Sequence, residues 1–240
     1  MDGQPLALVT GAAHRVGKAL ALALARRGYA ILLHHHHAAD QAVITADEIR
    51  SLSMPAYPVQ ADLTDETDII RLLSTIDSLP HQLKILINSA SIMQKTNLRE
   101  TSSSDWDATF AINLRTPFFL TQQIAKRMVV GGLIVNITDA GAHKPWTGYP
   151  AYVVSKLALE ALTRLQAKTY APDIRVNAIA PGLVLPSGNV TPAEWEKLVV
   201  SIPLKHSISL EDVAAALTFL LDNQSITGQT IVVDGGYSLT

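Results

Sequence analysis

The sequence of 240 residues predicts a single α/β domain in which a doubly wound parallel sheet of seven strands is covered by helices on both faces. Short apolar runs rich in Val, Ile and Leu alternate with longer amphipathic segments along the chain. The apolar runs show little internal alternation of apolar and polar residues, which is typical of strands buried on both sides. We see no linker or internal repeat, so one domain over residues 1–240 is expected.

The apolar and amphipathic runs give the expected order of elements. Strands are expected near residues 5–10, 30–34, 56–61, 83–88, 131–137, 174–179 and 229–233. Helices are expected near residues 15–27, 40–52, 65–77, 103–129, 149–170 and 210–222. A parallel sheet binds its ligand beyond the carboxyl ends of its strands, and Thr10, Asp62, Asn88 and Asp139 fall at such ends.

The segment 183–201 carries Pro, Ser, Gly, Asn and Thr followed by a short helical pattern. Binding loops often have this turn chemistry, so we expect a substrate lid here, and a passive surface loop is the alternative.

Composition excludes several classes of function. The formal net charge is −2 and the Lys and Arg residues are scattered, so no nucleic-acid surface is expected. Cysteine is absent from the sequence, which excludes disulfides and thiolate metal sites. With no run of about twenty apolar residues and no basic-then-apolar segment at the start, we expect no membrane span and a cytoplasmic location.

Residues 6–20 have the pattern of a strand, a glycine turn and a helix that binds a dinucleotide. Gly11 allows a tight turn, Gly17 allows the helix to pack closely on the strand, and the helix N-terminus favours a phosphate. Arg15 stands where the common fingerprint has a glycine. Its guanidinium can pair with a cofactor phosphate, and the alternative is an exposed arginine on the first helical turn.

Tyr152 and Lys156 are four residues apart and so share one face of a helix. A free phenol, with a pKa of about 10, is a poor acid or base at neutral pH. A fixed ammonium beside it favours the phenolate, so this pair predicts acid–base chemistry. Asp139 precedes Tyr152 by thirteen residues and adds a carboxyl group at the end of a predicted strand.

Together, these motifs resemble the short-chain dehydrogenase/reductase family along essentially the whole chain. Further matching landmarks are Ala61-Asp62-Leu63-Thr64, Asn88-Ser89-Ala90-Ser91, Asn113, Pro181-Gly182 and Val233-Asp234-Gly235-Gly236. The resemblance implies a Rossmann-like fold in which Asp62 holds adenine and Lys156 holds the nicotinamide ribose. It also implies that Tyr152 is the immediate proton donor or anchors the group that is, and that Asn113 keeps a water linking Lys156 to solvent. A homotetramer built on the helices containing Asn113 and Tyr152 is implied as well.

Within that family the chain resembles the pteridine reductases. The shared features are Arg15, the His-rich turn at 33–39, Asp139 in place of the usual catalytic serine, and the segment 192–239. The chain departs from that group at three places: Met93 replaces a ring that stacks on the pterin, His37-Ala38 replaces Arg-Ser, and Ser89 replaces the second asparagine of its turn. Trp146 either supplies the missing flat surface or packs on the core.

The four consecutive histidines, residues 34–37, favour NADPH over NADH rather than a metal site. Adjacent side chains on an extended segment point to opposite sides, so four cannot converge on one ion. They lie in the second βα turn, near the expected adenosine ribose, where His34 and His36 can add hydrogen bonds. No Asp or Glu closes the strand to hold a free 2′-hydroxyl, and Arg15 and Lys18 are expected nearby.

The expected function is hydride transfer from NADPH to a pterin-like heterocycle, of the dihydropterin or dihydromonapterin reductase type. The expected catalytic residues are Asn113, Asp139, Tyr152 and Lys156. Expected cofactor contacts are Gly11, His14, Arg15, Val16, Gly17, His34, His36, His37, Asp62, Leu63, Asn88, Ser89, Ala90, Thr138, Tyr152, Lys156, Pro181, Gly182 and Leu183. Expected substrate contacts are Ser91, Met93, Asp139, Trp146 and Tyr152.

Two alternatives stay open: an NADPH-dependent carbonyl reductase, and a cofactor-binding regulator without turnover. Asp139 has two possible roles as well. Its carboxyl can relay a proton to a ring nitrogen, or its carboxylate can accept hydrogen bonds from the substrate's amino group.

Overall fold

The computed structural model describes residues 4–186, 188 and 190–240. Seven parallel strands form one sheet in the order β3-β2-β1-β4-β5-β6-β7, which confirms the predicted architecture. The strands are β1 (Leu6–Val9), β2 (Ala30–His35), β3 (Ala56–Gln60), β4 (Leu83–Asn88), β5 (Gly132–Ile137), β6 (Ile174–Pro181) and β7 (Thr230–Val233).

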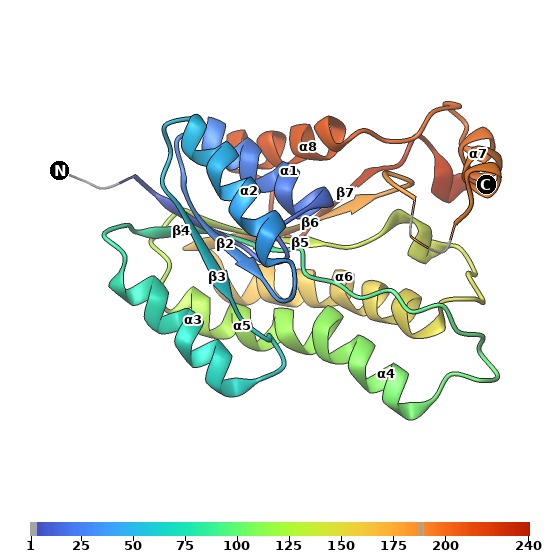
Figure 1. Cartoon of the computed structure of the whole chain (residues 1–240), viewed down its shortest axis with the longest axis horizontal. Helices are drawn as coiled ribbons and strands as arrows, with labels where there is room; N and C mark the ends of the chain where they lie inside the picture. Colours follow the sequence, from blue (N-terminus) through green and yellow to red (C-terminus); the bar gives the residue numbers. More distant parts are fainter. Residues whose placement is uncertain (1–3, 187, 189) are drawn as a thin grey trace.

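Helices cover both faces of the sheet (Figure 1), with α1, α2 and α8 on one face and α3 to α6 on the other. Their bounds are α1 (Arg15–Arg26), α2 (Ala39–Ser51), α3 (Glu66–Ser78), α4 (Ser103–Phe110), α5 (Thr116–Ala125), α6 (Pro150–Tyr170) and α8 (Leu210–Asp222). Strand β1 contributes alternate residues to two separate cores: Ala7 and Val9 to one, Leu6 and Leu8 to the other. Because both faces are buried, the strands contain few polar residues.

The single helix predicted over residues 103–129 is interrupted by a π-helical turn, η1 (Ala111–Arg115), between α4 and α5. Pro117 has no N–H group, so it cannot donate to the carbonyl of Asn113 four residues earlier. The amide of Thr116 instead donates to Ala111, five residues back. The wider turn leaves the side chain of Asn113 buried, at 1% exposure.

Helix α5 also ends earlier than predicted, at Ala125 rather than at residue 129. After this point the chain leaves the helix and turns toward the sheet, where the amide of Val129 donates to Leu83 at 3.1 Å. A bond to a neighbouring strand replaces the next helical bonds, which a local helical pattern does not reveal.

The predicted lid, residues 183–201, consists of an irregular segment and helix α7 (Pro192–Ser201). Thr191 and Glu194 form a capping box at the start of α7. Residues 187 and 189 of this segment lie outside the described residues. None of the helices in the described ranges is long and apolar enough to cross a bilayer.

Candidate active site

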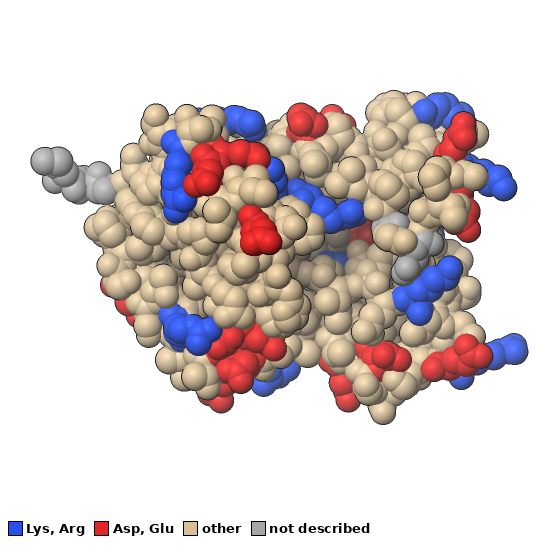
Figure 2. All heavy atoms as spheres, viewed as in Figure 1, with Lys and Arg blue, Asp and Glu red and all other residues tan. Residues whose placement is uncertain are grey.

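A cleft of about 560 Å³ lies beyond the carboxyl ends of the strands, as expected for a parallel sheet. Figure 2 shows the surface hollowed between the main body and the part that carries α7. Most predicted site residues line it: Gly11, His14, Arg15, Val16, Gly17, Ser89, Ala90, Ser91, Met93, Thr138, Asp139, Trp146, Tyr152, Lys156, Pro181, Gly182 and Leu183.

Asp139 and Tyr152 meet at the floor of the cleft. The Tyr152 hydroxyl, on the first turn of α6, donates to Oδ2 of Asp139 at 2.6 Å. The other carboxyl oxygen, Oδ1, accepts from the amide of Gly141 at 2.7 Å and so caps the 3-10 turn η2 (Ala140–His143). One oxygen therefore fixes the carboxyl group to the backbone while the other faces the phenol.

Burial keeps protons on this pair. It raises the pKa of Asp139 above that of an ordinary carboxyl group, against the opposing effects of the bonds from Tyr152 and Gly141 and the charge of Lys156. Burial and the nearby Asp139 also raise the pKa of Tyr152 well above its ordinary value. A protonated carboxyl group thus persists to higher pH than in water, which suits a proton donor.

The expectation that Lys156 favours the phenolate form of Tyr152 is wrong for the protein without a bound cofactor, because the pKa of Tyr152 is raised rather than lowered. The Lys156 ammonium donates to the carbonyl of Ile137 at 2.8 Å and lies 5.6 Å from the centre of the Tyr152 ring. Burial lowers the pKa of Lys156 to about 8 despite the nearby Asp139. On Tyr152 the effects of burial and Asp139 dominate.

Asn113 connects the loop after β4 to α6. Its Oδ1 accepts from Ser91 Oγ at 3.0 Å and from the Ile92 amide at 2.9 Å. Its Nδ2 donates to the carbonyl of Ile92 at 2.9 Å and to Ser155 Oγ at 3.1 Å. The side chain is therefore committed to positioning Ser91 and α6, and Pro117 cannot donate a regular helical hydrogen bond to the backbone carbonyl of Asn113.

The glycine turn between β1 and α1 leaves no room for side chains. Gly11 has φ of +63°, and a Cβ atom there would lie 2.9 Å from the Cα of Ala90. A Cβ atom on Gly17 would lie 2.2 Å from the carbonyl oxygen of Gly11. Backbone groups at the helix N-terminus are therefore open to the cleft, and this cradle fits the diphosphate of a dinucleotide.

Arg15 occupies a left-handed backbone conformation, with φ of +54°, where the common fingerprint has a glycine. A non-glycine residue in the left-handed region destabilises the folded state by about 1 kcal/mol relative to glycine, so Arg15 lowers stability slightly at this position. Its guanidinium donates to the carbonyls of Leu185 and Pro186, at 3.1 and 3.2 Å. It therefore joins the rim of the cleft to the segment 183–201 that the sequence predicts as a lid.

His34 lies inside the protein rather than on the cofactor side of its turn. Its Nδ1 accepts from the amide of Gly11 at 3.1 Å, so Nε2 carries the proton and donates to Ala61 at 3.0 Å. Burial lowers the pKa of His34 to about 4, which keeps the ring neutral. The side chain thus fixes the glycine turn, a structural role that sequence reasoning missed.

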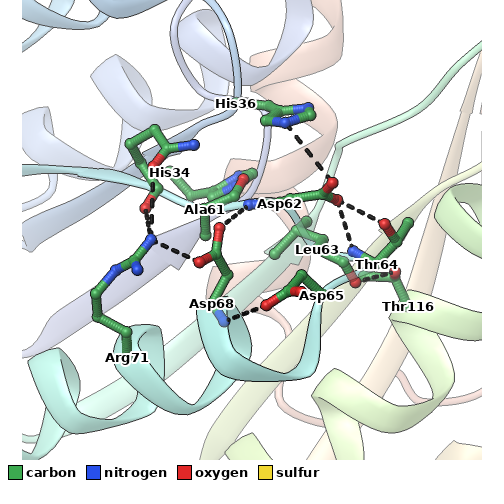
Figure 3. Close-up of polar contacts among 11 residues, drawn as sticks. His34, His36, Ala61, Asp62, Leu63, Thr64, Asp65, Asp68, Arg71 and Thr116 are labelled. Carbon is green, nitrogen blue, oxygen red and sulfur yellow. Dashed lines mark hydrogen bonds and ion pairs between the residues drawn. The ribbon is translucent and has the colours of Figure 1, made fainter.

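His35 is buried, whereas His36 and His37 are exposed, and His36 lies beside Asp62 (Figure 3). His36 Nε2 lies 3.8 Å from Oδ2 of Asp62, and its ring lies 3.5 Å from that of His37. The other oxygen of Asp62 accepts from the amide and hydroxyl of Thr64, which lowers the pKa of Asp62. Across residues 4–186, 188 and 190–240, no group of three His or acidic side chains is arranged to hold a metal ion.

Asn88 and Leu63 are also buried away from the cleft lining. Asn88 Nδ2 donates to Asn136 Oδ1 at 2.8 Å and to Thr121 Oγ1 at 3.2 Å, which ties β4 to β5 and α5. The carbonyl of Leu63 accepts from Thr116 Oγ1 at 2.9 Å. The Asn88 side chain and the Leu63 carbonyl therefore connect the elements that shape the cleft.

The far end of the cleft is lined by aromatic residues. Trp146 packs against Gly141, where a Cβ atom would lie 2.4 Å from its ring, and its centre is 6.1 Å from that of Tyr237. Trp146 therefore both packs on the core and faces the cleft. Sequence reasoning gave no individual site role to nine lining residues: Ile137, Gly148, Tyr149, Val184, Leu185, Val190, Trp195, Leu198 and Tyr237.

Nearly the whole chain is similar in sequence to a family of reductases. Residues 11–238 match the family model described as enoyl-(acyl carrier protein) reductase. The L-xylulose reductase of Caenorhabditis elegans is 31% identical over 96% of this chain and 94% of its own length. The 3-oxoacyl-(acyl-carrier-protein) reductase of Staphylococcus epidermidis is 29% identical over 96% of this chain and 97% of its own length.

Solved structures are similar over the whole chain. The FolM alternative dihydrofolate reductase 1 of Brucella canis, complexed with NADP, has a TM-score of 0.92 and 36% identity, covering 100% of this chain and 96% of that one. A blue fluorescent protein from a metagenomic library, in complex with NADPH, has a TM-score of 0.90 and 28% identity, covering 98% of both chains.

Proposed function

This chain belongs to the short-chain dehydrogenase/reductase family, and on that premise we propose that its cleft reduces a pterin-like heterocycle with NADPH. It is an NADP-dependent oxidoreductase of that family. The pterin assignment rests above all on Asp139, whose carboxyl group is hydrogen-bonded to Tyr152. The similarity to the FolM structures supports it.

The residues of the cleft fit NADPH. Gly11 and Gly17 provide the diphosphate cradle, and Arg15 places a guanidinium at the start of α1. His36 and His37 are exposed at the adenosine end, beside Asp62. Lys156, at the opposite end, would hold the nicotinamide ribose. The bound cofactor supplies the hydride.

The chain's own contribution is the proton. Hydride addition to the carbon of a C=N bond places the new electron pair on nitrogen, which then takes a proton. The carboxyl group of Asp139 would give that proton, directly or through a water, because burial raises its pKa. Tyr152 would stabilise the resulting carboxylate through the hydrogen bond that it already donates. The raised pKa favours this relay over a carboxylate that only accepts hydrogen bonds.

The aromatic lining suits a flat ring. Met93 gives a soft, polarizable surface in place of a stacking ring. Trp146, Tyr149, Trp195 and Tyr237 add aromatic surface at the same end of the cleft. The rival function, reduction of a ketone, is favoured by Met93 and by the relatives named as 3-oxoacyl and xylulose reductases.

A substrate panel tests the proposal. NADPH consumption would be followed with dihydrobiopterin, dihydromonapterin and dihydrofolate beside a 3-oxoacyl thioester and xylulose. We expect turnover of the pterins only, and loss of that turnover in Asp139→Ser. Ketone turnover that survives or rises in Asp139→Ser would establish the carbonyl reductase instead.

Tyr152→Phe is the matched control, since it should abolish turnover of either substrate class. If NADPH oxidation by the unchanged protein never exceeds that of Tyr152→Phe with any of these substrates, the result would favour the third hypothesis, a cofactor-binding regulator without turnover.

A further inference from the structure

A second cavity, of about 380 Å³, adjoins the cleft under the lid. It shares Tyr149, Val190 and Leu198 with the cleft, so these three side chains border both spaces. An elongated substrate with its flat ring beside Asp139 would therefore extend into this cavity. The shared side chains give the border between the two spaces an aromatic and apolar surface that such a substrate would contact.

Two lysines from distant parts of the chain line the second cavity. Lys95 comes from the loop after β4, and Lys197 comes from α7. Within the described part of the chain, neither ammonium makes an ion pair or a hydrogen bond. Both charges are thus available to a ligand in the cavity.

The acidic residue that lines this cavity, Glu194, is already committed. Its Oε2 accepts from the amide of Thr191 at 2.8 Å and from the Thr191 hydroxyl at 2.7 Å, which caps α7. These bonds, followed by the charges of Lys95 and Lys197, lower the pKa of Glu194, so it is an anion at neutral pH. Two cations against one anion leave a net positive charge, and the cavity favours an anionic group.

We propose that Lys95 and Lys197 bind the carboxylate end of a pterin substrate whose side chain passes through an aryl linker, as in dihydrofolate. This rests on the proposed function and specifies its substrate. Tyr149 and Leu198 would contact the linker, while the two ammonium groups make charge-assisted hydrogen bonds to the carboxylates. Dihydrobiopterin, which has no charged side chain, makes none of these bonds.

Kinetics of the two substrates separate this subsite from the ring site. We expect the double variant Lys95→Ala/Lys197→Ala to lower kcat/KM for dihydrofolate at least tenfold, mainly by raising KM. The kcat/KM for dihydrobiopterin should stay within twofold of that of the unchanged enzyme. Raising the salt concentration should increase the KM for dihydrofolate in the unchanged enzyme and change it little in the double variant. Lys126→Ala, an exposed lysine after α5 at the opposite end of the sheet, is the matched control.

An equal loss for both substrates, or none for dihydrofolate, would overturn the subsite. An effect confined to a dihydropterin phosphate would also overturn it, because the ligand would then be a phosphate. If the unchanged enzyme reduces no pterin, the proposed function fails separately. Calorimetric binding of p-aminobenzoyl-glutamate to the NADP-loaded protein still tests the subsite in that case, and affinity that is equal in the double variant would refute it.

Discussion

Asp139 separates two tasks between its carboxyl oxygens: one binds Gly141 and the other binds the hydroxyl of Tyr152. Asp139→Asn keeps an oxygen acceptor and the shape of the side chain but cannot give up a proton. We therefore expect kcat for a dihydropterin to fall by about 10²- to 10⁴-fold, while the Kd of NADPH changes little. Stopped-flow single turnovers and cofactor titration measure the two quantities.

The pH profile gives the control for this substitution. Because the protonated carboxyl group is the active form, kcat/KM should fall as pH rises through the raised pKa of Asp139. In the Asp139→Asn variant, kcat/KM should be low and should not change over this pH range. A decline of the same midpoint in the variant would assign the titration to another group.

At the scale of elements, the π-helical turn η1 determines where Asn113 lies. Pro117→Ala restores an N–H group that can bond to the carbonyl of Asn113 and extend regular helix through this turn. We expect the free energy of unfolding to stay equal or to rise, while kcat falls several-fold because the contacts of Asn113 with Ser91 and Ser155 shift. Chemical denaturation and steady-state kinetics check both parts.

Thr116→Ala is the neighbouring control: it removes the hydrogen bond to Leu63 without adding a backbone donor. It should cost stability and leave the position of Asn113 intact. Equal kcat in Pro117→Ala and the unchanged enzyme would mean that η1 has no catalytic role.

The elements also show what the sequence could and could not predict. The order of strands and helices and the convergence of Asp139, Tyr152 and Lys156 follow from local apolar patterns and spacing. The interruption of the predicted helix 103–129 depends on a single proline near the N-terminus of α5, where proline is normally tolerated. Trp195 and Tyr237 line the cleft because the segment 183–201 and the C-terminal turn pack against it. These are long-range contacts, which a local sequence pattern does not reveal.

At the scale of the whole molecule, His34 links stability to pH. Its pKa is about 4 in the folded protein against about 6.5 when unfolded, so protonation favours unfolding. Its stabilising contribution is complete above pH of about 6.5 and is lost as pH falls toward about 4. We expect this one group to lower the free energy of unfolding by about 2 kcal/mol between pH 7 and pH 5.

Urea denaturation at the two pH values tests this contribution. His34→Gln should be less stable at pH 7 but should lose about 2 kcal/mol less than the unchanged protein on acidification. His206→Gln, at an exposed position, serves as the control and should behave like the unchanged protein. Identical acid sensitivity in all three proteins would contradict the buried neutral ring.

The assembly of the molecule is also open to test. Phe119 on α5 and Leu157 and Leu165 on α6 are 49%, 38% and 66% exposed, which leaves apolar surface on this helical layer. We expect a homotetramer that buries this layer, and Phe119→Asp should reduce the mass found by light scattering. Val43→Asp, on α2 of the other layer, should leave the mass unchanged. A monomeric mass for the unchanged chain would refute the assembly.

The contacts of Arg15 predict an order of binding during turnover. The guanidinium that faces the phosphate cradle is the same one that holds the carbonyls of Leu185 and Pro186. A phosphate that binds this cation would compete with the two carbonyls, so we expect dinucleotide binding to weaken the contact of Arg15 with residues 185 and 186. We therefore expect the substrate to bind second, after the dinucleotide. Product inhibition should accordingly be competitive between NADP and NADPH and non-competitive between the reduced product and NADPH.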